Sequence, residues 1–176
     1  MSGIKVYAIR HLQTEWNGRN LLQGSTDIPI IDNKNLELNK DLLKLSNLPA
    51  FSSTLIRTQQ TALCYGFSEV KTSEYLNEMN FGDFEGKDKH HLLINKEAKW
   101  EKNPFCGSLS SNLLELEERI HSFKCLLKSS NIHEVVVFGH GAWIRLAIAK
   151  YKLNNKNLMN TFKIENAECN IFFFDF

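Results

Sequence analysis

An uninterrupted apolar run, Val135-Val136-Val137-Phe138, constrains the fold of this chain more than any other segment. The polar residue Glu134 precedes the run, and Gly139-His140 follows it. A strand that is apolar at consecutive positions is buried on both faces, which is typical of a parallel sheet covered by helices on both sides. Because a helical pattern from Ala142 to Tyr151 follows at once, we expect the run to be a central strand of an α/β protein.

The rest of the chain alternates strand-like and helix-like segments. Apolar and β-branched runs predict further strands at residues 5–9, 50–53, 70–72, 162–165 and 170–174. Helical spacing predicts helices in the leucine-rich segment 36–45, at 55–65 with a cap at Ser53 or Thr54, at 87–102, and from a cap at Ser110 or Ser111 through Leu127. Residues 77–86 are expected to form an ordered loop. This order predicts a three-layer α/β/α sandwich with a mostly parallel central sheet, and the lack of repeats and linkers predicts a single domain over residues 1–176.

The composition argues against several functional classes. The net charge is +1, so no global field attracts nucleic acid or an acidic membrane surface. No apolar stretch approaches the ~20 residues of a membrane span, and no signal-peptide pattern is found, so a cytoplasmic protein is expected. The four cysteines lie far apart, which predicts reduced, buried thiols, and we expect no metal site and no other cofactor.

Two histidines directly follow predicted strands. Arg10-His11 comes after the strand at 5–9, and His140 comes after the strand at 134–138. In open α/β sheets, ligands bind at the carboxyl ends of the strands, so these side chains are expected to meet at one edge of the sheet. A histidine at a strand end is, taken singly, more often structural, and its assignment therefore depends on the residues around it.

Four segments resemble, in the expected order, motifs of the histidine phosphatase superfamily, also called phosphoglycerate mutase-like. The first segment, Arg10-His11-Leu12-Gln13-Thr14-Glu15-Trp16-Asn17, resembles R-H-G-x-T-x-W-N. The others are residues 52–62, similar to S-S-x-x-x-R-[AT]-x-Q-T-A, residues 76–86, similar to L-x-E-x-x-F-G-x-[WF]-E-G, and residues 136–145, similar to V-x-H-G-x-x-I-R. One such motif is weak evidence, whereas four in order are specific. The resemblance implies a phosphoglycerate mutase-like fold.

The resemblance also implies a metal-independent phosphatase mechanism. His11 would attack phosphorus through a neutral ring nitrogen and form a covalent phosphohistidine. Glu78 would protonate the leaving alkoxide and then activate water, so an acidic pH optimum is expected. The other implied site residues contact the phosphate or the substrate; they are the phosphate clamp Arg10, Arg57 and His140, together with Asn17, Thr14, Gly24 and the backbone amide of Gly141.

Three stretches depart from the family pattern. Leu12 replaces the glycine that usually follows the nucleophile, which adds bulk beside the phosphate pocket and disfavours a positive φ. In the stretch Ile30-Ile31-Asp32-Asn33-Lys34-Asn35, where the family has L-T-x-x-G, Asn33 or Asn35 is expected to take over the left-handed turn. Ser110-Ser111-Asn112 stands where G-E-[ST] often opens a helix, which weakens any inference about substrate contacts on that side.

The resemblance leaves three functions open. Hydrolysis is favoured over mutase-type phosphotransfer, because the chain lacks the insertion after Gly86 and the tail that cover the site in mutases, and an open site favours water. The segment Leu76 to Glu85, with His90-His91 after it, is most similar to α-ribazole phosphatases, although small sugar or glycolytic phosphates stay open as substrates. The third function, binding phosphate esters without hydrolysis, requires neither His11 nor Glu78. The expected partner is a small phosphorylated metabolite, and the oligomeric state, a homodimer included, stays open.

Overall fold

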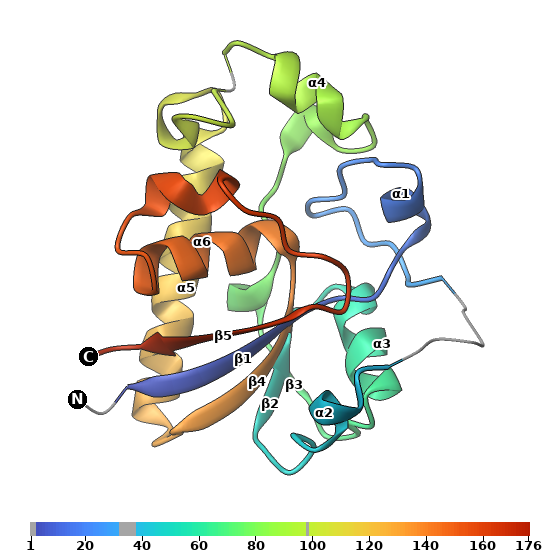
Figure 1. Ribbon diagram of the computed structural model, residues 1–176, viewed down its shortest axis with the longest axis vertical. Helices are drawn as coiled ribbons and strands as arrows, with labels where there is room; N and C mark the ends of the chain where they lie inside the picture. The colour runs from blue at the N-terminus through green and yellow to red at the C-terminus, as the bar shows by residue number, and fades with distance from the viewer. Residues whose placement is uncertain (1–2, 32–37, 98) are drawn as a thin grey trace.

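The computed structural model describes residues 3–31, 38–97 and 99–176. Its centre is a five-stranded sheet in the order β3-β2-β4-β1-β5 (Figure 1). The strands are β1 (Ile4–Arg10), β2 (Ala50–Ser52), β3 (Lys71–Thr72), β4 (Glu134–Gly139) and β5 (Cys169–Phe174). Neighbouring strands run parallel except β5, which pairs antiparallel with β1. The predicted mixed, mostly parallel sheet is confirmed.

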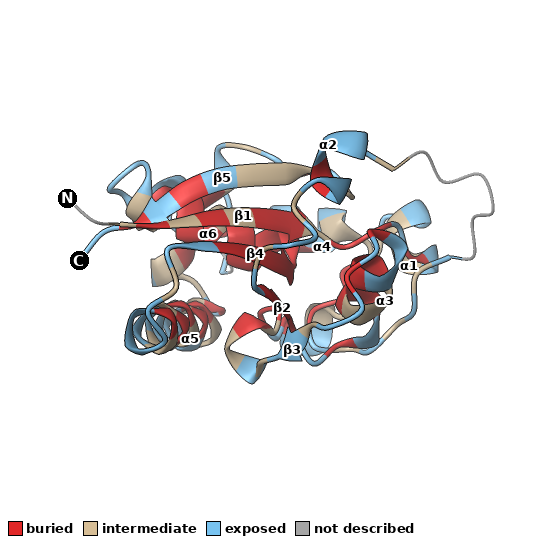
Figure 2. Ribbon diagram, turned by 90° about the horizontal axis from the view of Figure 1, so that it is seen from below, coloured by how far each residue is buried: buried red, intermediate tan, exposed pale blue. Residues whose placement is uncertain are grey.

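The apolar run in β4 supplies both faces of the sheet, as its sequence predicts. Val135 and Val137 pack in one apolar cluster, while Val136 and Phe138 pack in another. Successive side chains of a strand point to opposite faces, so four consecutive apolar residues serve two layers. Figure 2 shows the buried centre of the sheet, with α5 on one side and α2 and α3 on the other.

The two apolar clusters correspond to two helical layers. The first contains the buried faces of α5 (Ser110–Ser129) and α6 (Gly141–Tyr151). The second contains Leu42 of α2 (Lys40–Leu43) and Ala62 of α3 (Ile56–Cys64). Because helices bury apolar residues against both faces of the sheet, the predicted three-layer architecture is confirmed.

The remaining elements are short and lie mainly around the carboxyl ends of the strands. They are α1 (Glu15–Gly18), α4 (Lys89–Ile94) and the 3-10 helices η1 (Glu74–Leu76), η2 (Gly82–Phe84), η3 (Pro104–Cys106) and η4 (Lys156–Asn160). Within the described residues, no helix is long and apolar enough to cross a membrane.

Several sequence predictions of elements are wrong in detail. The helix expected at 87–102 is limited to α4, and the strand expected at 162–165 is an irregular loop. The leucine-rich segment forms only the four-residue α2, and the turn expected at Asn33 or Asn35 lies outside the described residues.

The expected helix caps and the expected cysteine environment also differ. The residues at the N-cap positions are Leu55 for α3 and Leu109 for α5, and neither accepts a side-chain capping bond. The four cysteines are free, as predicted, but Cys64, Cys106 and Cys125 are exposed rather than buried.

Candidate active site

The parallel pairing of β1 and β4 brings the two strand-end histidines together. Arg10 lies opposite Gly139 in the register, and the backbone amide of His11 donates to the carbonyl oxygen of Gly139 at 3.0 Å. The rings of His11 and His140 consequently lie with their centroids 5.5 Å apart. The expectation that these residues meet at one edge of the sheet is confirmed.

His11 is held in one tautomer by the backbone. Its Nδ1 lies 2.7 Å from the carbonyl oxygen of Leu12, which only accepts hydrogen bonds, so Nδ1 carries the proton. The Nε2 atom is therefore left with its lone pair. Burial, together with the nearby charges of Arg57 and Arg10, lowers the pKa of His11 well below its usual value, and the ring stays neutral. A neutral imidazole with a free Nε2 is a nucleophile.

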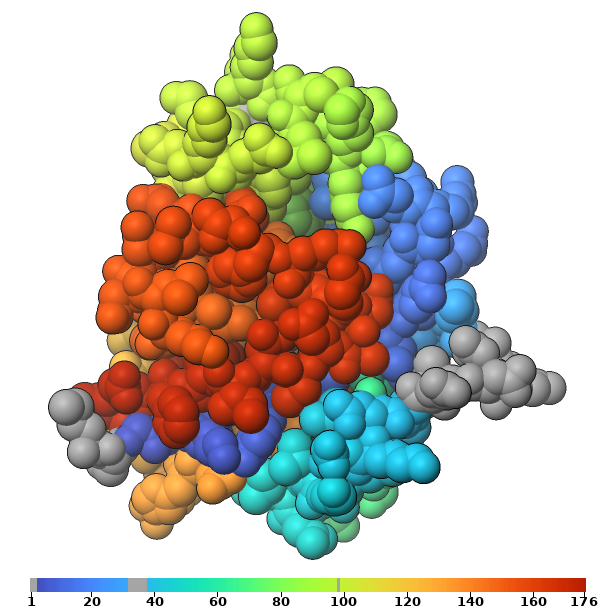
Figure 3. All heavy atoms as spheres, in the orientation of Figure 1, coloured from blue at the N-terminus to red at the C-terminus, as the bar shows by residue number. Residues whose placement is uncertain are grey.

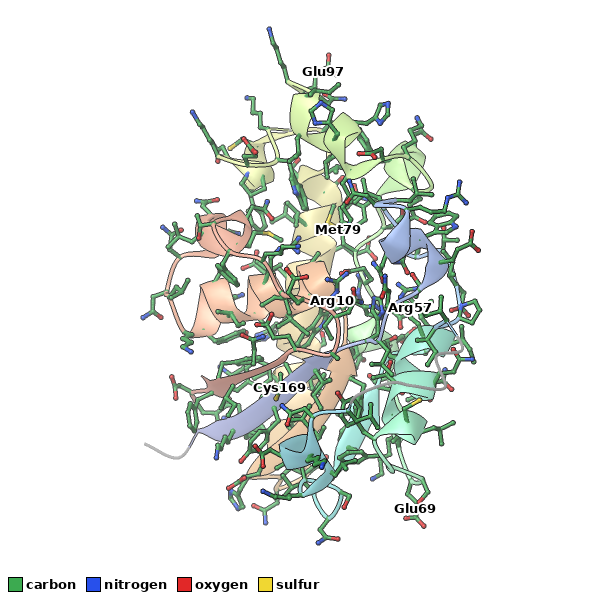
Figure 4. All side chains as sticks on the ribbon, turned by 45° about the vertical axis from the view of Figure 1, so that its right-hand side comes forward. Arg10, Arg57, Glu69, Met79, Glu97 and Cys169 are labelled. Carbon is green, nitrogen blue, oxygen red and sulfur yellow. The ribbon has the colours of Figure 1, made fainter. Side chains whose placement is uncertain are left out.

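Arg57 lies fully buried in the first turn of α3 and is held at each nitrogen. Its Nε donates to Nδ1 of His140 at 3.2 Å, its Nη1 to the carbonyl of Thr26 at 2.8 Å, and its Nη2 to the carbonyl of Gly24 at 2.7 Å. Burial lowers the pKa of Arg57 to about 10, so the guanidinium is still charged at neutral pH. Figure 4 shows Arg57 and Arg10 in the middle of the molecule, far from Glu69 and Glu97 at its ends.

His140 lies behind Arg57, with both ring nitrogens occupied. Because Nδ1 accepts from Arg57, the proton of the neutral ring is on Nε2, which donates to Oγ of Ser53 at 2.7 Å. Burial and the charge of Arg57 lower the pKa of His140 well below its usual value. In this arrangement His140 orients Arg57 and adds no positive charge of its own.

Glu78 lies against the N-terminus of α6. Its two carboxylate oxygens accept from the backbone amides of Met79, Ala142 and Trp143 at 2.9–3.1 Å. Exposed amides and the helix dipole make such a terminus a site for anions. The amide of Gly141, which the sequence assigns to the phosphate, precedes these amides at the wall of the cavity.

The loop between α6 and β5 fastens the end of β1. Nη1 of Arg10 donates to the carbonyl of Ile164 at 2.7 Å, and the amide of Ala167 donates to the carbonyl of Arg10. Nδ2 of Asn166 donates to the carbonyl of His11 at 2.9 Å and to Oδ1 of Asn17 at 3.1 Å. The loop thereby fixes three residues of the first motif, Arg10, His11 and Asn17, from the far end of the chain.

These side chains surround a cavity of about 500 Å³. Among the sequence-predicted site residues, the ones that line it are Arg10, His11, Asn17, Gly24, Arg57, Glu78 and Gly141. Its apolar wall consists of Leu21, Leu22, Phe81, Leu92, Leu93, Trp100, Phe162 and Ile164. Figure 3 shows three contributing segments meeting on one face: the blue N-terminal segment, green α4 and the orange-red segment after α6.

Other predicted residues lie outside the cavity wall. Thr14 is buried and caps α1, where its hydroxyl accepts from the amide of Asn17. His140 lies behind Arg57, as described above, and His90 and His91 are exposed on α4 without lining the cavity. In the part of the chain that the structure describes, no group of three or more His, Cys, Asp or Glu side chains is arranged to hold a metal ion.

Leu12 does not narrow the cavity. Its side chain is buried and is absent from the cavity lining, and its φ is not positive. Its amide donates to Oγ1 of Thr61 at 2.9 Å. The replacement of glycine therefore changes the layer behind the site rather than the space for a ligand.

Sequence reasoning missed two residues that hold the cavity wall. Glu85 accepts from the amides of Ser25, Thr26 and Phe81 and from the hydroxyls of Thr26 and Ser25. Burial opposes the shift, but hydrogen bonds, that of the Thr26 hydroxyl first, lower the pKa of Glu85. Glu85 lies inside the third motif, so the signal was present. Asn166 is in no motif, and only the fold brings it to His11.

Comparisons with known proteins identify the family of this chain. A model of the histidine phosphatase superfamily (branch 1) matches residues 6–175. A protein of Hydrogenobacter thermophilus named putative phosphoserine phosphatase 2 is 28% identical over 155 residues, which cover 82% of this chain and 76% of that protein. Several other curated relatives, named probable phosphoglycerate mutases, are longer, and the matched part spans 60% of their length.

Solved structures resemble the whole fold. The phosphoserine phosphatase of Entamoeba histolytica in complex with 3-phosphoglyceric acid has a TM-score of 0.76 and 26% identity, over 96% of this chain and 89% of that one. A putative α-ribazole-5'-P phosphatase of Escherichia coli has a TM-score of 0.71 and 21% identity, with the same shares covered, and supports the fold alone. The chain belongs to branch 1 of the histidine phosphatase superfamily and is an enzyme of that superfamily acting on phosphomonoesters.

Proposed function

We propose that this protein hydrolyses a small phosphomonoester through a phosphohistidine on His11. The observation that carries the proposal is the hydrogen bond from Nδ1 of His11 to Leu12, which leaves Nε2 as a neutral nucleophile at the cavity. Arg10 and Arg57 supply positive charge beside it. A transferred phosphoryl group gathers negative charge on its oxygens, and guanidinium groups fixed in advance stabilise that charge.

The reaction then has two steps. The lone pair of His11 Nε2 forms a bond to phosphorus while the bond to the leaving oxygen breaks. For this step Glu78 must first be protonated, and it gives that proton to the leaving oxygen. Water next attacks phosphorus and gives a proton to Glu78, and the phosphorus–nitrogen bond breaks, which returns the neutral imidazole. The proposed steps use no metal ion or cofactor, because Glu78 and the attacking water supply the protons and the two arginines supply the positive charge.

The substrate belongs to the small phosphorylated metabolites. α-Ribazole 5'-phosphate is one candidate, and the aromatic residues of the apolar wall (Phe81, Trp100 and Phe162) favour a substrate with a planar ring. Phosphoserine is a second candidate, supported by the names of the relatives. Phosphotransfer between substrates is the alternative reaction, and the exchange of phosphate between two labelled esters distinguishes it from hydrolysis.

The test is the hydrolysis of p-nitrophenyl phosphate from pH 4 to 8 in EDTA. We expect activity in the wild type and a loss of at least 10³-fold in His11→Ala, on the scale of losing a catalytic group. The exposed His121 of α5, replaced by alanine, is the matched control and retains activity. Quenching in base preserves a phosphohistidine, and the wild type but not His11→Ala should carry one phosphoryl group by intact mass.

Two results contradict the proposal. One is a His11→Ala variant that hydrolyses p-nitrophenyl phosphate as fast as the wild type does. The other is activity that EDTA removes and magnesium restores.

A further inference from the structure

Asn166 lies outside the four motif segments and takes no part in the proposed mechanism. It belongs to the segment between α6 and β5, which runs to the carboxyl end of β1 (Figure 1). Its Nδ2 donates to the carbonyl oxygen of His11 at 2.9 Å and to Oδ1 of Asn17 at 3.1 Å. Asn166 is absent from the cavity lining, whereas His11 and Asn17 are part of it. Any effect of Asn166 on a ligand is therefore exerted through these two residues.

The backbone of Thr14 determines which way the side-chain amide of Asn17 points. Such an amide has an oxygen that accepts and a nitrogen that donates, and its hydrogen-bond partners select between the two orientations. The backbone amide of Thr14 can only donate, so the atom of Asn17 that lies 3.1 Å from it is the oxygen Oδ1. The hydroxyl of Thr14 accepts from the backbone amide of Asn17 and donates its own proton to the same Oδ1. Two donors from one residue thus hold this oxygen.

The orientation of Asn166 follows from the same reasoning. Its side-chain amide faces two oxygens, the carbonyl of His11 and Oδ1 of Asn17, and both can only accept, so the atom that faces them is the donor Nδ2. Oδ1 of Asn17 then has three donors, two from Thr14 and one from Asn166. The Nδ2 atom of Asn17 makes no hydrogen bond within the described residues. Because Asn17 lines the cavity, the two N–H bonds of this atom can be donated to a ligand.

We propose that Asn166 is a positioning residue, which holds the amide of Asn17 with Nδ2 toward the phosphoryl oxygens of the substrate. The inference rests on the proposed function, because it assumes that the phosphoryl group binds beside His11. An N–H donor forms a charge-assisted hydrogen bond with a phosphate oxygen, whereas a rotated amide presents its own oxygen and repels the phosphate. Asn166 disfavours the rotated amide, because the nitrogen of Asn17 would then face the N–H groups of Asn166 and Thr14, donor against donor.

The test is a double-mutant cycle on phosphate affinity. Calorimetry measures the binding of inorganic phosphate to the wild type, Asn166→Ala, Asn17→Ala and the double variant. We expect Asn166→Ala to weaken binding by about threefold to tenfold, the range of one hydrogen bond. In the Asn17→Ala background the same substitution should change the affinity by less than about twofold, because the amide through which Asn166 acts is gone. Two residues that act independently would instead give additive losses.

Asn170→Ala is the matched control. Asn170 lies in β5 and donates through Nδ2 to Oε1 of Glu168 at 2.8 Å, but it does not line the cavity. Its replacement removes the same amide from a nearby part of the chain and should leave the phosphate affinity unchanged. Where Asn166→Ala does not fold, Asn166→Ser takes its place in the cycle, because the serine side chain ends one bond short of Nδ2 and keeps a polar group.

The side-chain amide signal of Asn17 gives a second readout. In proton–nitrogen correlation spectra this signal is identified by its absence in Asn17→Ala, and it should shift as phosphate is added to the wild type. At equal saturation with phosphate the shift should be smaller in Asn166→Ala, because the amide of Asn17 is no longer held toward the ligand. A purely structural role of Asn166 would lower the melting temperature and leave this shift unchanged, which would contradict the inference.

Other results would also overturn the inference. They are phosphate affinity that is unchanged in Asn166→Ala, a loss that persists in full in the Asn17→Ala background, an equal loss in Asn170→Ala, and a wild type that binds no phosphate. Binding does not depend on turnover, so a coupled cycle in a protein without phosphatase activity supports the role of Asn166 while the proposed function fails. Additive losses in an active phosphatase leave the proposed function intact while the inference fails.

Discussion

Gly24 lies at a position of the cavity wall where only a glycine fits without displacing its neighbours. Its φ is +55°, and a Cβ there would collide with the carboxylate of Glu85 and lie 3.0 Å from the carbonyl oxygen of Met79. Its own carbonyl accepts from Nη2 of Arg57. Any shift that relieves the collision therefore moves an acceptor of the buried arginine.

We predict that Gly24→Ala lowers both stability and activity. An alanine in the left-handed region costs about 1–2 kcal/mol by itself, and displacing Glu85 adds to that cost. Because Arg57 loses its fixed position, kcat/KM for p-nitrophenyl phosphate should fall by about tenfold or more, the scale of a misplaced charge-stabilising group. Urea unfolding and steady-state kinetics measure the two effects.

Gly82→Ala is the matched control, because Gly82 has the same φ of +55° and nothing lies within 4 Å of its would-be Cβ. It should show the backbone strain alone, with activity close to that of the wild type. Equal losses in the two variants would mean that the collision with Glu85 is relieved without cost.

At the scale of single residues, the sequence predicts which side chains line the cavity but does not predict their hydrogen-bond partners. The four motifs identify six of the residues that line the cavity, because each motif fixes a chemical group at a strand or helix end. The motifs do not reveal that His140 gives both ring nitrogens to Arg57 and Ser53, since side-chain partners are set by packing. The motifs also do not reveal that the side chain of Leu12 lies outside the cavity, because the sequence does not specify the backbone conformation at Leu12.

At the scale of elements, α5 holds the loop that carries Glu78, the acid of the proposed mechanism. Arg119 of α5 donates through Nη2 to the carbonyl of Glu78 at 3.1 Å, and more weakly to that of Asn77 at 3.4 Å. Its Nη1 binds the exposed Glu115 one turn away. A helix packed in the core thus fixes the backbone of a loop residue, and Arg119 is a positioning residue for Glu78.

We predict that Arg119→Gln slows the reaction most where the leaving group needs a proton. The kcat for glycerol 3-phosphate, whose alkoxide is a poor leaving group, should fall by about tenfold to a hundredfold, the range of general acid catalysis lost by misplacement. The kcat for p-nitrophenyl phosphate should fall much less, because p-nitrophenolate leaves without protonation. Kinetics on both esters measure the difference.

Glu115→Gln separates this role from the loss of an ion pair. The Glu115 side chain is exposed, and such pairs contribute about 0.3–0.5 kcal/mol, so both kcat values should stay near those of the wild type. A variant of Arg119 that slows both esters equally would argue for a general structural effect instead.

The elements of the sheet layers could be predicted from the sequence, whereas those around the cavity could not. Strands and helices such as β4 and α6 have apolar patterns that match a buried layer. The helix α4 ends at Ile94. Directly after it, the side chain of Asn95 accepts from the amide of Glu97, and this local hydrogen bond competes with helix formation. The segment 162–165 resembles a strand, but the carbonyl of Ile164 is bound by Arg10 instead of by a neighbouring strand.

At the scale of the whole molecule, the site makes stability depend on pH. His11 and His140 are buried as neutral rings with their pKa values well below 6.5. Between the unfolded value near 6.5 and the lower folded value, the unfolded chain binds more protons than the folded one, so the free energy of unfolding falls as the pH falls. The pKa of Glu85 is lowered from 4.5, so its contribution to the free energy of unfolding is lost only below that pH. Between pH 7.5 and 5, the change in stability is therefore expected to come from the buried histidines.

We predict that the wild type loses stability steeply between pH 6.5 and 5, and that His11→Asn loses it less steeply. Each buried neutral imidazole contributes a slope of up to about 1.4 kcal/mol per pH unit, and the variant lacks one of them. Urea unfolding at pH 7.5, 6.5, 6 and 5 gives the slopes, which are compared instead of the absolute stabilities because an active-site substitution changes those as well. His133→Asn, which replaces an exposed histidine, should have a slope closer to that of the wild type. Parallel curves for the wild type and His11→Asn would mean that His11 takes up its proton in the folded protein as readily as in the unfolded chain, and the neutral nucleophile would then be lost at acid pH.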